Sequence, residues 1–176
     1  VSVASNGAQA NNASFDGLAI SADGRYVVFS SMASNLILND TNDKLDVFVH
    51  DRQTGQTTRV SISSNFTQAN NSSATSSNGG FLAISADGRY VVFDSYASNL
   101  VLSDTNNVSD VFTHDLQTHQ TTRVSIASNG IQTNNNSGVY SQGISADGRY
   151  VVFDSYASNS VPDDTNSFQD IFVYDR

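Results

Sequence analysis

The sequence predicts an all-β fold, a β-propeller built of four-stranded antiparallel blades, with three blade repeats in one domain. The first observation is the decapeptide ISADGRYVVF, which occurs unchanged at Ile20–Phe29, Ile84–Phe93 and Ile144–Phe153. Identical segments at an interval of about sixty residues indicate a repeat architecture. The second observation is an Asp-Gly pair between apolar runs in each copy, which is typical of β-hairpins. The third is that no segment shows helical periodicity, and Pro162 is the only proline.

Each repeat opens with an apolar strand that turns back at the Asp-Gly pair. Glycine accepts a positive φ without strain, and aspartate shapes the turn through its own hydrogen bonds. In the strand after the first turn, Tyr26 and Val28 point to one face of the sheet. Val27 and Phe29 point to the other face, so we expect this strand to be covered on both sides. The arginine after each turn is expected to form a local ion pair or to contact the adjacent blade: Arg25, Arg89 and Arg149.

The third and fourth strands complete the repeat. The third strand of the first repeat, Asp46–Asp51, is mostly apolar. The fourth strand, TTRVSI, alternates in polarity, so we expect Val60 and Ile62 to face inward. Arg59 and Ser61 are then expected to face water. Four-stranded sheets that repeat at this interval and stack face to face are propeller blades. A β-solenoid is the alternative, but its coils are normally shorter and need no hairpin.

The repeats resemble the blades of the TolB-type β-propeller family, in which a Ser-Pro-Asp-Gly turn precedes an apolar strand and a later Asp-Ile-Tyr-type strand. The first turn here reads Ser21-Ala22-Asp23-Gly24, with alanine where that family usually has proline. The later strand begins Asp46-Val47-Phe48, Asp110-Val111-Phe112 and Asp170-Ile171-Phe172. The resemblance covers nearly the whole chain and implies a propeller, for which this family favours six blades. It implies little about function, because the scaffold hosts unrelated activities.

The positions of the first and last residues within the repeat predict how the blades are completed. The three repeats span approximately residues 1–59, 60–123 and 124–176, and all belong to one propeller segment. The opening VSVASNG matches the segments that begin at Val60 and Val124, so we expect the chain to start on an outermost strand. The last residues follow the third strand of the last repeat. The first strand would then complete the last blade, which is the offset, velcro-type closure of propellers.

Three blades are too few for a closed ring, which typically needs roughly four to eight. An uncovered blade face and an unpaired strand edge both favour association. We therefore expect either a second copy of the chain, which closes a six-bladed ring as a homodimer, or flanking blades of a longer chain. End-to-end assembly of copies into filaments is a further alternative.

Composition excludes several classes of function. The net charge is −9, from 17 acidic and 8 basic side chains, and no cluster of Lys and Arg occurs, so we expect no nucleic-acid partner. No apolar run reaches the roughly twenty residues of a membrane span. The chain has no cysteine, which excludes disulfides and thiolate metal sites. Neither a nucleophile elbow nor a phosphate-binding glycine loop is present, so we expect no enzyme activity.

The acidic loop before the third strand of each repeat is the candidate metal site. Its copies read DTNDKLD, DTNNVSD and DTNSFQD, with oxygen-bearing side chains at the first, third and seventh positions. Calcium takes about six to eight oxygen ligands, which alternating Asp and Asn residues supply. The predicted calcium ligands are Asp40, Asn42, Asp46, Asp104, Asn106, Asp110, Asp164, Asn166 and Asp170. The alternative is structural: the first Asp and the Asn shape an Asx turn, and the last Asp accepts backbone hydrogen bonds where the strand starts.

These observations favour a non-catalytic binding or assembly module of a bacterial surface, periplasmic or secreted protein. Its ligand would be a protein or a glycan, bound by the Asn/Ser-rich loops that differ between repeats, such as 69–80. One alternative is a structural repeat that polymerises end to end into filaments. A second alternative is a propeller enzyme domain that acts on polysaccharide.

Overall fold

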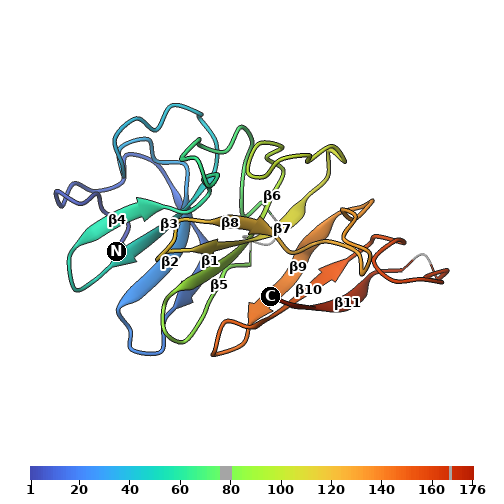
Figure 1. Ribbon diagram of the computed structural model, residues 1–176. Coiled ribbons are helices and arrows are strands. Elements are labelled where there is room, and N and C mark those ends of the chain that lie inside the picture. The colour runs from blue at the N-terminus through green and yellow to red at the C-terminus, as the bar shows by residue number, and fades with distance from the viewer. Residues whose placement is uncertain (76–80, 167) are drawn as a thin grey trace.

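Figure 1 shows the computed structural model, which describes residues 1–75, 81–166 and 168–176. Three antiparallel sheets follow one another along the chain, and no helix occurs among the described residues. The first sheet holds β1 (Ser14–Ile20), β2 (Tyr26–Ser31), β3 (Asp46–Asp51) and β4 (Gln56–Arg59); the second holds β5 (Ala83–Ile84), β6 (Tyr90–Ser95), β7 (Asp110–Asp115) and β8 (Thr121–Arg123); the third holds β9 (Ser137–Ile144), β10 (Tyr150–Ser155) and β11 (Asp170–Asp175). The predicted all-β fold of repeated antiparallel sheets is confirmed.

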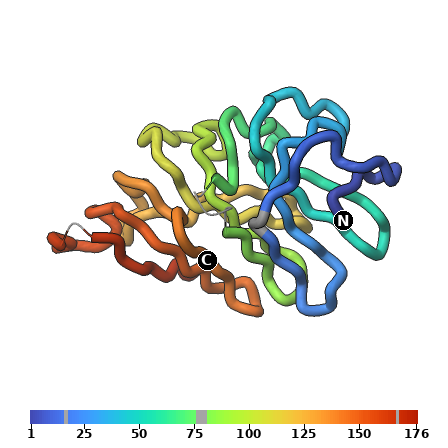
Figure 2. The backbone as a smooth tube through the Cα atoms, turned by 180° about the vertical axis from the view of Figure 1, so that it is seen from behind, coloured from blue at the N-terminus to red at the C-terminus, as the bar shows by residue number. Residues whose placement is uncertain are grey.

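The sheets are arranged in a row. The second sheet lies between the first and the third, as the views from the front and from behind both show (Figure 1, Figure 2). Within each sheet every strand pairs with its neighbour in sequence, so the chain runs as a meander. The third sheet has three strands, and β11 is therefore its edge.

The Asp-Gly turn between β1 and β2 is held by a small set of local hydrogen bonds. Asp23 Oδ1 accepts from Ser21 Oγ at 2.6 Å and from Arg25 N at 2.9 Å. Ser21 Oγ accepts in turn from Tyr26 N at 2.9 Å. Gly24 has a φ of 70°, a conformation that side chains with a Cβ rarely adopt. The same bonds recur in the other two copies, which confirms the predicted hairpins.

The arginine after each turn pairs with the end of the third strand of its own sheet. Arg25 donates from Nε to Asp51 Oδ1 at 3.0 Å and from Nη2 to Oδ2 at 2.7 Å. Its guanidinium also lies over the Tyr26 ring, 4.7 Å from the ring centre. The same pairs form in the other sheets, between Arg89 and Asp115 and between Arg149 and Asp175. The arginine therefore joins two strands of one sheet, and among the described residues it pairs with no carboxylate of the adjacent blade.

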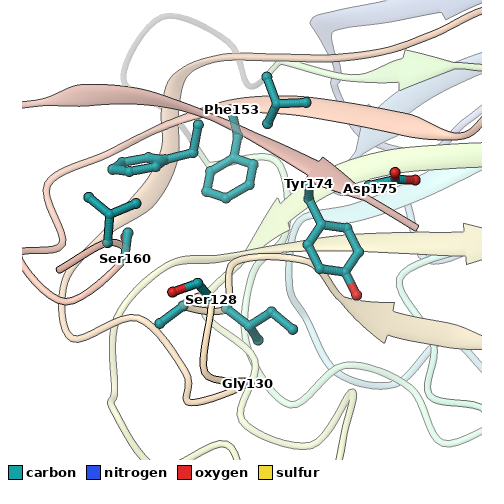
Figure 3. A pocket seen from close by; sticks show the side chains of 11 residues that line it. Ser128, Gly130, Phe153, Ser160, Tyr174 and Asp175 are labelled. Carbon is teal, nitrogen blue, oxygen red and sulfur yellow. The ribbon is translucent and has the colours of Figure 1, made fainter.

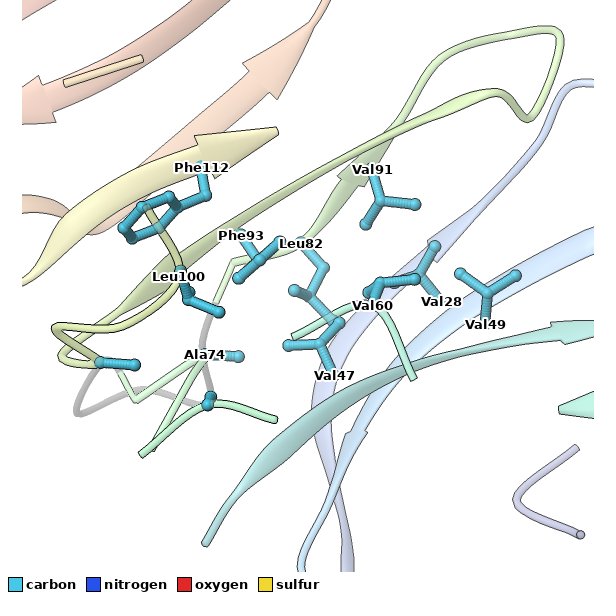
Figure 4. Packing of buried hydrophobic residues seen from close by; sticks show 12 residues of the cluster. Val28, Val47, Val49, Val60, Ala74, Leu82, Val91, Phe93, Leu100 and Phe112 are labelled. Atoms are coloured by element: carbon cyan, nitrogen blue, oxygen red, sulfur yellow. The ribbon is translucent and has the colours of Figure 1, made fainter. Parts of the chain in front are cut away.

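The main hydrophobic core lies between the first and second sheets (Figure 4). Val28, Val47 and Val49 of the first sheet pack against Val91 and Phe93 of the second, and all five are buried. Val28 lies opposite Val49 in the β2–β3 register, so both point to the same face. Phe29 on the other face of β2 is also buried. The prediction that this strand is covered on both sides is confirmed.

A second core joins the second and third sheets in the same way. Val92 and Val111 of the second sheet pack with Val124, which follows β8, and against Val151 and Phe153 of β10. Each sheet thus uses the face of its interior and third strands to bind the next sheet.

The turns of neighbouring sheets also bond to one another. Ala22 N donates to Ala86 O at 3.1 Å, and Ala86 N donates to Ala146 O at 3.1 Å. A Cβ on Gly88 would overlap the Tyr26 ring of the preceding sheet. Glycine at this turn therefore sets how closely two sheets approach.

The N-terminal segment differs from the predicted outermost strand. Residues 1–10 form an irregular hairpin with one isolated bridge, between Val3 and Gln9. Thr57 Oγ1 donates to Val3 O, so the segment lies against β4 without extending the sheet. Equivalent bridges follow β4 and β8, between Ile62 and Gln68 and between Ile126 and Gln132. The prediction was wrong because the matching VSI sequence comes after the fourth strand and is not part of it.

The fourth strand is also shorter and less exposed than predicted. It covers Gln56–Arg59, and the chain then bends, because the backbone N–H groups of both Val60 and Ser61 donate to Val47 O. Val60 is buried as predicted. However, Ser61 is fully buried and the side chain of Arg59 is only 6% exposed, so neither faces water. Both side chains point instead into the acidic loop of the sheet.

Candidate functional site

The acidic loop of the first sheet closes around Arg59. Arg59 Nη1 donates to Asp40 Oδ1 at 3.1 Å and to Asp46 Oδ2 at 3.3 Å. Ser61 Oγ donates to Asp46 Oδ1 at 2.5 Å, and Asn42 Nδ2 donates to Asp46 Oδ2 at 2.9 Å. The structure thus brings three predicted calcium ligands together, but it directs the carboxylate oxygens at donors of the protein.

The buried position of this loop makes the arginine necessary. Burial raises the pKa of Asp46, while the hydrogen bond from Ser61 and the charge of Arg59 act in the opposite direction. Burial also raises the pKa of Asp40, again against the charge of Arg59. A buried carboxylate is costly unless a cation and hydrogen bonds compensate it. Arg59 supplies that compensation from within the fold.

The second sheet repeats the arrangement. Arg123 Nη1 lies 3.4 Å from Asp104 Oδ1 and 3.3 Å from Asp110 Oδ2. Ser125 Oγ donates to Asp110 Oδ1 at 2.6 Å, and Asn106 Nδ2 donates to Asp110 Oδ2 at 3.1 Å. Two independent copies of the sequence therefore fold into the same charged cluster.

The third sheet has the acids but not the arginine. Asn166 Nδ2 donates to Asp170 Oδ2 at 3.2 Å, as in the other loops. Among the described residues no arginine pairs with Asp164 or Asp170, because the arginine belongs to a fourth strand that this sheet lacks. Both carboxylates are partly exposed, whereas Asp46 is fully buried.

The asparagine of each loop forms the Asx turn that the structural interpretation predicts. Asn42 Oδ1 accepts from Lys44 N at 3.1 Å, and the other two asparagines accept in the same way. The partners of Asp46 are side chains, however, and not the backbone N–H groups expected at the strand start. Within the described part of the chain, no group of three His, Cys, Asp or Glu residues is placed to hold a metal.

One calcium ion in each loop stays a prediction. Calorimetric titration of chelator-treated protein with calcium chloride tests it, together with the melting temperature. Heat and a raised melting temperature would support calcium binding. In the first two loops arginine already balances the charge, so calcium would have to displace its contacts there.

One face of the third sheet is uncovered. Val152, Ile171 and Val173 are 40%, 63% and 67% exposed. The equivalent positions of the second sheet, such as Val92 and Val111, are fully buried against the third sheet. β7 is buried at every residue, whereas β11 alternates between exposed and half-buried positions. The third sheet therefore carries the apolar side chains of an interface without the sheet that would cover them.

A cavity of about 290 Å³ lies beside the edge strand β11 (Figure 3). Its walls are Phe153, Phe172 and Tyr174 of the third sheet and Ile126 and Ser128 of the segment that follows β8. In the second sheet the corresponding place beside β7 is filled by β8. The cavity is therefore the position of a fourth strand, and we call it the strand slot.

A second cavity, of about 750 Å³, lies on the side of the second sheet. It is lined by Ser64, Asn99, Leu102, Asp104 and Thr121, among others. Its one carboxylate, Asp104, lies against Arg123 and is not free to act as an acid or a base. The cavity therefore offers a binding surface, at which Leu102 is 94% exposed. Its lining holds no second carboxylate that could form a catalytic pair with Asp104.

The residues that sequence reasoning missed are the arginines of the fourth strand. The signal was present, because the heptapeptide QTTRVSI occurs identically at Gln56–Ile62 and Gln120–Ile126. An arginine that faces water needs no acidic partner. The recurrence of this arginine after two of the acidic loops therefore indicates that arginine and loop interact.

Comparison with known proteins finds structural likeness at low sequence identity. The chain is similar to a TolB protein from Agrobacterium tumefaciens, with a TM-score of 0.50, 16% identity, and coverage of 84% of this chain and 40% of that one. It is also similar to a structure from an analysis of two prolyl endopeptidases, with a TM-score of 0.50, 14% identity, and coverage of 92% and 20%. The β-propeller domain of the Trilobed protease from Pyrococcus furiosus aligns with a TM-score of 0.47 and 12% identity over 94% of this chain and 44% of that one. No family model matches the chain, and no curated protein matches it.

At these identities the likeness shows the fold and nothing further. The chain has the β-propeller fold, and the predicted resemblance to TolB-type propellers is confirmed at that level. The chain spans less than half the length of each of these structures.

Proposed function

We propose that the chain is a non-catalytic assembly module, a run of propeller blades that is completed by a further sheet packing on its third sheet. The observation that supports this most is the exposure of Val152, Ile171 and Val173. The same repeat positions in the first and second sheets form the interfaces to the next sheet. A surface that the fold has twice used for packing is the natural place for a third interface.

The energetic argument agrees with this role. Burying a fully exposed Val or Ile side chain contributes about 1.5–3 kcal/mol, and these three are only partly exposed, so covering them contributes roughly 3–5 kcal/mol before the cost of association. If these side chains stay in water, this gain is lost and a contiguous apolar patch is exposed. Such a patch is rare in monomeric proteins.

The covering sheet has three possible sources. A second copy would close a six-bladed ring, end-to-end packing of copies would produce filaments, and flanking blades of a longer chain would cover the face within one molecule. The first two predict association of the purified chain, and their masses differ: a discrete doubling for the ring and a ladder for filaments.

The test is light scattering on the wild-type chain and on Val173→Glu. A buried, unpaired carboxylate opposes association, so we expect the wild type to associate with rising concentration and the variant to stay at single-chain mass. Leu102→Glu is the matched control, because it places the same charge on a more exposed apolar residue away from this face. An equal effect of both substitutions contradicts the proposal, and a wild type of single-chain mass at high concentration rules out both the ring and the filament, which leaves flanking blades of a longer chain as the covering sheet.

The proposed ligand is a protein or a glycan, bound by the variable loops between sheets, and the proposed location is extracellular, cell-surface or periplasmic. No helix in the described ranges is long and apolar enough to cross a membrane. Cell fractionation tests the location and a glycan array tests the ligand. Turnover in a screen of polysaccharides would overturn the non-catalytic role.

A further inference from the structure

We propose that the second sheet carries a carbohydrate site, at which an uncharged pyranose ring stacks on Phe66 and His119 beside the cavity of that sheet. This inference rests on the ligand part of the proposed function and deepens it, because it names the class of ligand and the residues that bind it. It needs no covering sheet. The observations that carry it are two aromatic side chains in strained backbone positions that glycine occupies elsewhere in the chain.

Phe66 lies in a turn whose two copies have glycine in its place. The segment 63–66 reads Ser-Ser-Asn-Phe, whereas its copies, 4–7 and 127–130, both read Ala-Ser-Asn-Gly. The turn itself is the same, because Phe66 N donates to Ser63 O at 2.9 Å and each glycine makes the equivalent bond. The φ of Phe66 is 64°, in the left-handed region that glycine prefers. A bulky side chain in this conformation is strained.

His119 is the same kind of exception in the hairpin between β7 and β8. The equivalent residue in the hairpin between β3 and β4 is Gly55. Each of the two donates from its backbone N to the carbonyl of the aspartate that ends the third strand, at 2.8 Å. Their φ values are 59° and 75°. The backbone of this hairpin therefore needs no side chain here, and strain that a fold retains is typical of functional positions.

The two strained residues contact each other. The ring centres of Phe66 and His119 lie 5.6 Å apart, with an angle of 52° between the ring planes. Phe66 is 66% exposed, and His119 is exposed as well. Burial therefore does not explain the pair. We call these two residues the aromatic pair, and it presents a ring surface to solvent.

The aromatic pair lies beside the cavity of about 750 Å³. Asn65, which precedes Phe66, lines this cavity, and so does Thr121, which begins β8 just after the turn that holds His119. Sites for small ligands typically enclose roughly 300–1,000 Å³. The cavity and the rings together therefore provide a concave site with an aromatic wall.

The lining of the cavity favours an uncharged ligand with many hydroxyl groups. Apart from a short apolar run that ends at Leu102, its side chains are mainly those of serine, threonine and asparagine. The exposed side chains of Asn65 and Ser103 supply an amide and a hydroxyl. Among the described residues of the lining the one charged side chain is Asp104, which is paired with Arg123.

A pyranose ring matches this combination of groups. It has a C–H face that packs against an aromatic ring and hydroxyl groups around its rim that exchange hydrogen bonds with amides and hydroxyls. A charged ligand would find no free partner of opposite charge in the lining, and the net charge of −9 opposes an anion in addition.

The first sheet provides an internal reference. It has an equivalent cavity of about 400 Å³, lined by Ser5, Leu38 and Thr57, among others. The positions of the aromatic pair are held there by Gly7 and Gly55. The repeat therefore folds without the aromatic pair, and the pair is an addition of the second sheet.

The first experiment places a fluorescent reporter in the aromatic pair. The chain has no tryptophan, so Phe66→Trp introduces a single one and keeps an aromatic face. Titration with cellotetraose, maltotetraose and chitotetraose, each in its own arm, should change the emission saturably in at least one arm. Phe168→Trp is the matched control, because it makes the same substitution at a more exposed phenylalanine away from the cavity, and its emission should not change.

The second experiment measures binding and stability on the same variants. Phe66→Gly and His119→Gly restore the residue that the other repeats have and relieve the strain. Calorimetry should show oligosaccharide binding weakened at least about tenfold in both, while the melting temperature stays the same or rises. Leu38→Ala, at the cavity of the first sheet, should leave the binding unchanged.

Each outcome decides the proposal. No emission change with any of the three oligosaccharides overturns the carbohydrate site. Unchanged binding in both glycine variants, together with a lowered melting temperature, makes the aromatic pair structural and also overturns it. An emission change with a capped oligolysine peptide and with no oligosaccharide would assign the pair to a basic protein segment, which overturns the class of ligand.

Light scattering decides the assembly role separately. An equal effect of Val173→Glu and Leu102→Glu on association contradicts the proposed assembly and leaves oligosaccharide binding by the wild type as evidence for the site. A chain that associates as proposed but binds none of the oligosaccharides retains the assembly role and loses the carbohydrate site.

Discussion

At the scale of the residue, the burial of the acidic loops and the burial of the fourth-strand arginines depend on each other. Asp40 and Asp46 are buried because Arg59 neutralises them, and Arg59 is buried because they accept its hydrogen bonds. Composition alone cannot reveal this, since an arginine in an alternating strand is usually solvated. The pairing joins a loop to a strand 13 to 19 residues later in the chain, and the fold brings the two together across β3.

Removing the buried arginine should be strongly destabilising. Arg59→Gln leaves two buried carboxylates without a cation, and we expect the free energy of unfolding to fall by about 3–5 kcal/mol. Arg149→Gln is the control, because Arg149 and Asp175 are both largely exposed, and no measurable change is expected there. Urea denaturation measures both variants. Equal losses in the two variants would contradict the buried-pair interpretation.

Asp94, at the end of β6, is a second residue with an unusual environment. It is 1% exposed, and its Oδ2 accepts from Thr75 N at 3.1 Å. Its Oδ1 has no hydrogen-bond partner in the described part of the structure. Burial raises the pKa of Asp94 to about 6. The folded chain therefore binds this proton more tightly than the unfolded chain does.

Stability should consequently fall as the pH rises from about 4 to about 6. In this range the folded state binds the proton more tightly than the unfolded state, whose pKa is about 3.9, so deprotonation favours unfolding. The gap corresponds to about 3 kcal/mol lost by pH 7. Denaturation at several pH values should show a smaller loss in Asp94→Asn than in the wild type, because the raised pKa values of Asp40 and Asp46 act in both. A variant with the same pH dependence as the wild type would contradict it.

At the scale of the element, the Asp-Gly hairpin does two things. It reverses the chain, as the sequence predicts, and it also sets the distance between sheets, which the sequence does not reveal. The evidence for the second role is the bonding of adjacent turns and the contact of Gly88 with the Tyr26 ring.

Two glycine substitutions separate these roles. Gly88 and Gly55 both have a φ of 75°, so alanine costs about 1 kcal/mol of backbone strain at either position. Gly88→Ala also forces a Cβ into the Tyr26 ring and should cost a further 1–3 kcal/mol or so, whereas Gly55→Ala meets open space. Thermal or urea denaturation measures the difference. Equal effects would show that the turn does not control sheet spacing.

The same elements show which features of the fold can be predicted from the sequence and which cannot. The hairpins and the doubly covered interior strands follow from local chemistry, namely Asp-Gly turns and apolar residues at Tyr26–Phe29, and both were predicted correctly. The limits of β4 and the path of residues 1–10 were not, because alternation assumes that one face meets water. Arg59 and Ser61 face an acidic loop instead, and this contact is tertiary. The calcium prediction is untested, and the grouping of the acidic residues around arginine could not be predicted from the loop alone.

At the scale of the whole molecule, three copies of one sheet stack in sequence, and the last is incomplete in two ways. It lacks a strand beside β11 and a sheet over Val152, Ile171 and Val173. The open edge of β11 and the uncovered face lie at the same end of the row, so one partner that continues the stack of sheets would cover both. The proposed assembly would therefore depend on the repeat architecture and not on any single loop.

The most direct measurement of this claim is hydrogen exchange of β11 and β7 at a dilution where the chain is monomeric. The account predicts that the outward-facing amides of β11 exchange at least about tenfold faster than those of β7, which β8 protects. Equal protection of β11 and β7 in the free monomer would mean that the third sheet is already complete, and it would contradict the account.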